Sequence, residues 1–237
     1  MIHIITVHFK SDKWIDLQLK QIDKYVSDYK VWTHCDEFDI SPHRHKFHFC
    51  ENSEVTVKAE YKNHLLKLNA LTENVVWDDD TKDDDILIFM DSDAFPVNDV
   101  NDYVVEKLSK YPLLAVYRPE NGGDVIPHPS FTCSTVAFWK EHNLDWGGIR
   151  GGELGTKDPG GKLYQYLLKN NIEWYRMRRT KSLTKHEVFF TIYDNLVYHH
   201  GAGSRKKNSS CRGGRFGAKY DANEMFEMIS EENFLEK

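Results

Sequence analysis

The chain has 237 residues, a formal net charge of −6 and 40% hydrophobic residues. This length suits one α/β domain with a sizeable core. The negative charge argues against a nucleic-acid binder, because such binding depends on clustered Lys and Arg that neutralise phosphates. No apolar run approaches the length of a membrane span, and the first apolar run is too short for a secretory segment. We therefore expect a soluble, cytoplasmic protein without an integral membrane segment.

The chain starts with a strand, a helix and a second strand. Residues 2–9 are rich in β-branched residues and predict a strand, a helix follows from Asp12 to about Val26, and residues 30–34 predict the next strand. Strands joined in this way form a right-handed parallel unit. The later pattern predicts helices over 54–74, 99–110, 158–169 and from about 221, and strands over 86–90, 112–117, 131–139, 172–177, 188–192 and 196–198.

Two carboxylates, Asp91 and Asp93, directly follow the apolar strand over 86–90. The open carboxyl edge of such a sheet is where α/β proteins bind ligands. In an extended Asp-x-Asp both side chains point the same way, and like charges about 5 Å apart repel by about 3 kcal/mol at an effective dielectric near 20. A divalent cation between them relieves this repulsion. Oxygen ligands suit Mg²⁺ or Mn²⁺, whose open positions accept diphosphate oxygens.

Two adjacent histidines, His199 and His200, follow the last predicted strand and precede a Gly-Ala-Gly segment. Adjacent residues of an extended strand point in opposite directions, so we expect one of the two to bind a metal. A mixed set of Asp and His ligands suits Mn²⁺ better than Mg²⁺. The alternative is a pair of exposed histidines at the end of a strand.

The segment 85–96, Asp-Ile-Leu-Ile-Phe-Met-Asp-Ser-Asp-Ala-Phe-Pro, resembles the metal-binding DxD segment of GT-A-fold glycosyltransferases. These enzymes transfer a sugar from a nucleotide diphosphate donor, and they often supply a third metal ligand from a position similar to that of residues 197–204. The resemblance implies one GT-A-like, Rossmann-related α/β/α sandwich over 1–237 with a mixed, mostly parallel sheet. Its parts would be a nucleotide-sugar half (about 1–97), an acceptor half (about 98–200), and a basic loop with a C-terminal helix (201–237).

The resemblance also implies roles on the donor side. It favours His199 over His200 as the third metal ligand, although the order could reverse. Asp36, at the end of the second strand, resembles the acidic residue that contacts the base or ribose, and a turn aspartate is the alternative. The other candidate donor contacts are Ser92 within the DxD segment, His64 in the preceding helix, and Arg205 and Lys206 in the basic loop. The alternative for His64 is a solvated polar helix face, and the alternative for the basic loop is a solvated or acidic-surface-binding tail.

Glu153 and Asp158 are the candidate bases on the acceptor side. In inverting enzymes that this chain resembles, a carboxylate at a helix start after a Gly-rich loop deprotonates the acceptor hydroxyl, and Asp158 has that place. Asp158 is also a suitable helix N-cap, and a helix N-terminus weakens a carboxylate as a base. The sequence leaves open whether the enzyme retains or inverts.

We therefore expect a metal-dependent, hexosyltransferase-like enzyme that moves a sugar from a UDP- or GDP-sugar to a glycan or other hydroxyl acceptor. One alternative is a sugar nucleotidyltransferase, although the Gly-rich signature expected after the first strand is missing. A HAD-type phosphatase usually has its Asp-x-Asp near the N-terminus and not in the middle of the chain. The third alternative is an inactive sugar-binding module.

Overall fold

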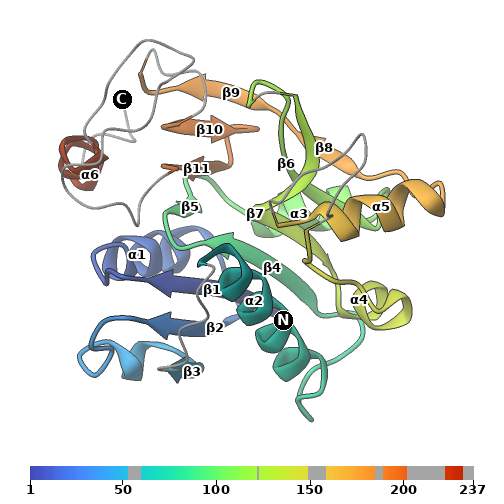
Figure 1. Ribbon diagram of the computed structural model, residues 1–237, viewed down its shortest axis with the longest axis horizontal. Coiled ribbons are helices and arrows are strands. Elements are labelled where there is room, and N and C mark those ends of the chain that lie inside the picture. Colours follow the sequence, from blue (N-terminus) through green and yellow to red (C-terminus); the bar gives the residue numbers. More distant parts are fainter. Residues whose placement is uncertain (53–59, 122, 149–158, 185–188, 202–221, 232–237) are drawn as a thin grey trace.

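A seven-stranded sheet forms the centre of the protein (Figure 1). The computed structural model describes residues 1–52, 60–121, 123–148, 159–184, 189–201 and 222–231. The strand order is β3-β2-β1-β4-β7-β6-β8. The strands are β1 (Ile2–Phe9), β2 (Tyr29–Asp36), β3 (Phe49–Asn52), β4 (Ile86–Asp91), β6 (Leu113–Arg118), β7 (Asp124–Thr135) and β8 (Tyr175–Met177). Only β7 among these strands is antiparallel to its neighbours, β4 and β6, so the expected mixed, mostly parallel sheet is confirmed.

A smaller antiparallel sheet begins where β4 ends. Its order is β5-β11-β10-β9, and Figure 1 shows its strands one above another, above β4 in that view. The turn at Ser92 and Asp93 joins β4 of the large sheet to β5 of the small one. The strands are β5 (Ala94–Pro96), β9 (Arg179–Ser182), β10 (Thr191–Tyr193) and β11 (Val197–His199).

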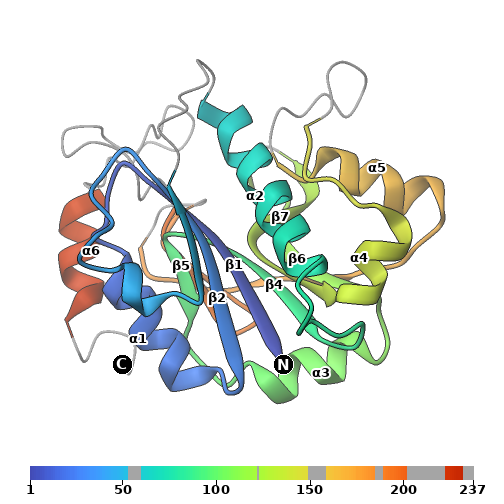
Figure 2. The same ribbon diagram turned by 90° about the horizontal axis from the view of Figure 1, so that it is seen from below.

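Helices cover both faces of the large sheet (Figure 2). The small sheet, α1 (Ile15–Tyr25) and α3 (Asn101–Leu108) share one core cluster with the large sheet, while α2 (Glu60–Val76), α4 (Val136–His142) and α5 (Gly161–Lys169) share the other. The last helix, α6 (Ala222–Ser230), packs Phe226 against Trp14 beside α1. A 3₁₀ turn spans Arg44–Lys46. None of the helices in the described ranges is long and apolar enough to cross a membrane.

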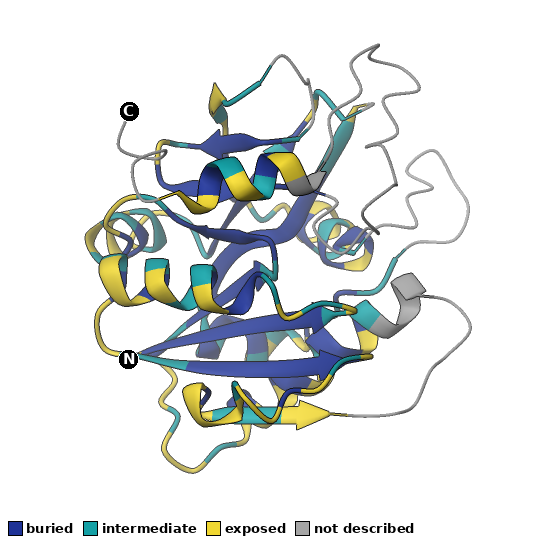
Figure 3. Ribbon diagram, turned by 90° about the vertical axis from the view of Figure 1, so that its left-hand side faces the viewer, coloured by how far each residue is buried: buried dark blue, intermediate teal, exposed yellow. Residues whose placement is uncertain are grey.

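The central strands are buried on both faces. Ile4, Ile88 and Met90 pack into the cluster under α1, whereas Ile5 and Phe89 pack into the cluster under α2. Figure 3 shows the same arrangement, with buried central strands and exposed outer helix surfaces. Burial on both faces explains why β4 is a continuous apolar run in the sequence and does not alternate with polar residues.

Several element boundaries differ from the prediction, among them the starts of α4, α1 and α5. The strand predicted over 131–139 ends at Thr135, because the Thr135 hydroxyl caps α4 by accepting the Phe138 N–H at 3.2 Å. Helix α1 begins at Ile15, since Asp12 contributes its backbone carbonyl to the Ile15 N–H and Trp14 is the N-cap. Helix α5 begins at Gly161 with Gly160 as its N-cap, later than predicted. The short strands β3, β5 and β9 were not predicted.

One buried histidine makes the stability of the fold depend on pH. His8 is fully buried near the end of β1, and neither of its ring nitrogens has a hydrogen-bond partner in the described part of the chain. Burial lowers the pKa of His8 to about 3. The unfolded chain takes up this proton near pH 6.5, well before the folded chain does, so acid favours unfolding.

We predict that His8→Leu makes the protein less sensitive to acid. Protonation of His8 in the unfolded chain lowers the free energy of unfolding as the pH drops from 6.5 toward 3. The loss is about 2 kcal/mol between pH 6.5 and 4.5. Urea unfolding at these two pH values measures the difference. The matched control is His45→Leu at an exposed position, which should keep the wild-type slope. Equal pH dependence in wild type and His8→Leu would contradict the prediction.

Candidate metal site

The turn between the two sheets is fixed by a buried glutamine. The side-chain amide of Gln18 in α1 donates to the backbone carbonyls of Asp91 at 2.8 Å and Ala94 at 2.7 Å. Its own carbonyl accepts a hydrogen bond from the Thr6 hydroxyl at 3.4 Å. These bonds satisfy backbone groups where the chain leaves one sheet and enters the other. The turn therefore holds Asp91 and Asp93 in one geometry.

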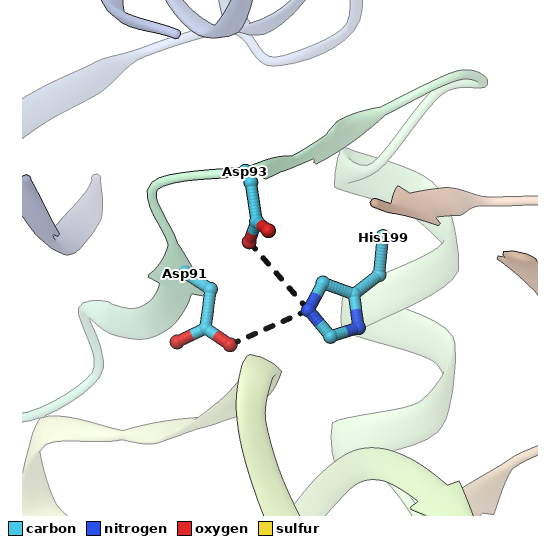
Figure 4. A group of neighbouring side chains, drawn as sticks. All are labelled: Asp91, Asp93 and His199. Atoms are coloured by element: carbon cyan, nitrogen blue, oxygen red, sulfur yellow. Dashed lines mark ion pairs between the residues drawn. The ribbon is translucent and has the colours of Figure 1, made fainter. Parts of the chain in front are cut away.

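His199 reaches the two carboxylates through strand pairing. β11 pairs with β5 in a register that sets His199 opposite Ala94, and the backbone N–H of His200 donates to the Asp93 carbonyl at 3.0 Å. The His199 Nε2 atom lies 3.6 Å from Asp91 Oδ2 and 3.5 Å from Asp93 Oδ1. Figure 4 shows the ring facing both carboxylates. Asp91 ends β4 and Asp93 lies in the turn, so the expected extended Asp-x-Asp is bent there, yet both carboxylates face the same ring.

The three side chains form a group with the geometry of a metal site. One ligand atom from each of Asp91, Asp93 and His199 lies within 4.8 Å of the other two, and the described ranges contain no other such group. A metal with bonds near 2.1 Å spaces neighbouring ligands by about 3 Å, so the two distances from His199 to the carboxylates need to close by about half an ångström. Two carboxylates and one imidazole suit Mn²⁺, and three ligands leave coordination positions for another molecule.

Two more histidines surround Asp91. His64 of α2 has its Nε2 atom 3.4 Å from Asp91 Oδ1. His128 of β7 lies 3.9 Å from Asp91 Oδ2 through Nδ1, and its ring centroid lies 5.6 Å from that of His199. His128 was not among the site residues predicted from the sequence. The available signal was its place between Pro127 and Pro129, since prolines inside a strand indicate an irregular position.

His128 is a neutral ring. Burial and the nearby Arg118 hold the pKa of His128 well below its usual value. Its Nδ1 accepts the Ser130 N–H at 3.1 Å, so the proton of the neutral ring is on Nε2. The approach of Nδ1 to Asp91 is therefore not an ion pair, and His128 offers an N–H donor to a ligand.

His200 has different neighbours from His199. Its Nδ1 is 2.9 Å from the Tyr198 hydroxyl, and its ring packs against Trp14 and Phe190. It is fully buried and is not in the group of possible metal ligands. The structure thus places one of the two adjacent histidines at the carboxylates and uses the other to pack the small sheet against α1.

Asp36 lies at the same edge of the sheet as Asp91, because β2, β1 and β4 are parallel. It is 1% exposed, and Lys67 of α2 binds its Oδ2 atom. The lysine neutralises this buried carboxylate. A ribose or base contact by Asp36 stays a prediction, and such a ligand would meet an aspartate already paired with a cation.

The remaining predicted site residues are Ser92, Glu153, Asp158, Arg205 and Lys206. Ser92 lies in the turn between Asp91 and Asp93. Glu153, Asp158, Arg205 and Lys206 lie outside the described residues.

Solved structures with a similar fold include glycosyltransferases. TarS of S. aureus is 14% identical over 70% of this chain and 33% of its own, with a TM-score of 0.48. GlyE, a glycosyltransferase of Streptococcus pneumoniae, is 12% identical over 75% and 46%, with a TM-score of 0.46. The mannosyltransferase PcManGT of Pyrobaculum calidifontis, solved with GDP-Man and Mn²⁺, is 13% identical over 74% and 54%, with a TM-score of 0.48.

This chain therefore spans between a third and about half of the length of these proteins. No protein-family model matches the sequence, and no curated protein matches it.

The Lys67–Asp36 pair gives a stability prediction. Lys67→Met leaves a buried carboxylate without its cation, so we expect it to lower the free energy of unfolding by about 3–5 kcal/mol. Lys140→Met is the matched control, because it breaks a pair with Asp83 that is largely exposed and should cost less than about 1 kcal/mol. Chemical denaturation measures both. Equal losses in the free energy of unfolding would contradict the prediction, because the buried Lys67–Asp36 pair would then matter no more than the Lys140–Asp83 pair.

Proposed function

We propose that this chain is a metal-dependent glycosyltransferase that transfers a sugar from a nucleotide diphosphate sugar to a hydroxyl acceptor. The observation that carries the proposal is the convergence of Asp91, Asp93 and His199 at the carboxyl edge of the large sheet. This edge is where open α/β sheets bind ligands. Two carboxylates that share one site need a cation before they can accept a diphosphate.

Each side chain at this site would have its own role. Asp91, Asp93 and His199 would hold Mn²⁺ or Mg²⁺, and the bound ion would act as a Lewis acid for the departing diphosphate. His128 would donate its Nε2–H to an oxygen of the donor. His64 orients the Asp91 carboxylate from the other side, at 3.4 Å.

The finer parts of the proposal concern the two substrates. The donor is a UDP- or GDP-hexose, with Asp36 at its ribose or base and with Ser92, Arg205 and Lys206 at its diphosphate. The acceptor is a glycan or another hydroxyl compound, and Asp158 or Glu153 is the base if the enzyme inverts. Residues 1–97 would form the donor half and residues 98–200 the acceptor half of a single domain.

Nucleotide binding should require the metal. We expect UDP or GDP to bind in the presence of Mn²⁺ and to lose at least ten-fold in affinity in EDTA, because the carboxylates alone repel a diphosphate. Asp91→Asn, Asp93→Asn and His199→Asn should each weaken Mn²⁺-dependent binding to a similar extent. Calorimetry with both nucleotides measures these effects.

The matched control is Asp84→Asn, which removes one exposed carboxylate at the opposite end of β4. It should bind nucleotide like the wild type. Equal nucleotide affinity with EDTA and with Mn²⁺ would remove the metal from the proposal. Metal-dependent binding without sugar transfer or donor hydrolysis would favour an inactive sugar-binding module.

Asp36 should govern nucleotide identity and not metal affinity. Asp36→Asn keeps the shape but loses the charge, so a hydrogen bond from the base or ribose to a charged acceptor is weakened. We expect the preference among UDP, GDP and CMP to change by about ten-fold while Mn²⁺ affinity stays constant. Calorimetry on folded variant protein gives both constants. An unchanged preference would place the base elsewhere.

A further inference from the structure

Two arginines next to and within the edge strand β8 stack on aromatic rings. The guanidinium carbon of Arg176 lies 4.8 Å from the Trp174 ring centroid and 5.9 Å from that of Tyr117. The guanidinium carbon of Arg178 lies 4.6 Å from the Tyr117 ring centroid. The two aromatic rings also contact each other, with centroids 6.2 Å apart. We call these four residues the arginine–aromatic ladder.

No carboxylate neutralises the charges of the ladder within the described ranges. Both arginines are exposed, and their side-chain contacts are with the aromatic rings. Nearby arginines differ, since Arg118 pairs with Asp124 at 2.8 Å and Arg179 pairs with Glu120 at 3.5 Å. The whole protein carries a net charge of −6. The Asp194 carboxylate accepts the backbone N–H of Arg178 at 2.8 Å, but neither guanidinium group of the ladder has an ion-pair partner among the described residues.

The ladder lies at the same edge and on the same face of the large sheet as Asp91, Asp93 and His199, which we call the metal group. β8 runs in the same direction as β4, so Arg178 follows β8 at the edge where Asp91 ends β4. Tyr117 and Trp174 pack into the same cluster as Phe89 and the helix α2 that carries His64. Three strand spacings, about 14 Å, separate β4 from β8 in the order β4-β7-β6-β8.

The chemistry of the ladder fits an anion. A guanidinium that stacks on an aromatic ring keeps the N–H donors at its edge available for hydrogen bonds. Two of these donors can bind a carboxylate or phosphate in a bidentate manner. Arg176 and Arg178 are two residues apart on one side of a strand, which spaces their heads by about 7 Å. That spacing suits two neighbouring charges of one extended ligand.

We propose that the arginine–aromatic ladder is a subsite for an anionic acceptor glycan. Carboxylate or phosphate groups of the glycan bind Arg176 and Arg178, while a hydroxyl group further along the chain reaches the metal group. The assignment of this ligand as the acceptor rests on the proposed glycosyltransferase function.

Titration with defined oligomers tests the subsite. The probes are an oligogalacturonate with carboxylates, an oligo(glycerol phosphate) with phosphodiesters, and a neutral malto-oligosaccharide, each added without nucleotide or Mn²⁺. We expect at least one anionic probe to bind more tightly than the neutral one. The double variant R176Q/R178Q should weaken that binding by about ten-fold or more, as expected for lost charge-assisted hydrogen bonds. The anionic probe that binds more tightly shows whether the subsite prefers carboxylates or phosphodiesters.

The control is K82Q/K169Q, which removes the same charge from exposed positions that precede the amino ends of β4 and β8. It should change affinity less than two-fold. Failure of every anionic probe to bind, or equal losses in the two double variants, overturns the subsite. Unchanged affinity together with self-association of R176Q/R178Q overturns it as well and assigns the arginines to protection of the sheet edge. Because nucleotide and metal are left out, these outcomes are separate from the tests of metal-dependent nucleotide binding.

Discussion

The geometry of the site depends on one buried amide. Gln18 ties together the last residue of β4 and the first residue of β5 through their backbone carbonyls, and it does so from inside α1. Buried carbonyls at such a junction need partners, and a single side chain provides two donors at once. The start of β5 is thereby fixed, and with it the register of β11. His199 arrives beside Asp91 and Asp93 as a result of that register.

Charge is distributed unevenly along the carboxyl edge. The metal group concentrates two carboxylates at β4, and burial keeps the neighbouring His128 neutral, so this ring does not offset them. Two strands away, at the end of β2, a lysine offsets the buried Asp36. At the far end of the sheet the arginine–aromatic ladder is positive. The edge is therefore negative at β4 and positive at β8. With a cation at Asp91 and Asp93, both positions would attract negatively charged groups.

Much of the fold was predictable because it depends on local composition. β1 has the predicted bounds, since a short run enriched in β-branched residues favours a strand over a helix. The expected α/β/α class is confirmed by the sheet itself. The Asp-x-Asp pair was visible because it directly follows an apolar strand.

The features that were not predictable depend on tertiary contacts. The apolar run after Phe131 changes from strand to helix at Thr135, where the Thr135 hydroxyl caps the helix. Gln18 looks like a surface residue of an amphipathic helix, yet it is fully buried. His128 gains its place through the pairing of β7 with β6, whose register is irregular there. β5 is too short to give a periodic signal.

The two sheets contribute to the metal group from distant parts of the chain. Asp91 and Asp93 lie near the middle of the sequence, while His199 comes from a strand that pairs late in chain order. Contacts of such long separation form slowly, because the intervening chain must first be ordered. A bound ion would act as a reversible cross-link between the sheets and would stabilise only molecules in which β11 has docked. Metal occupancy would then report completed folding as well as readiness to bind a nucleotide.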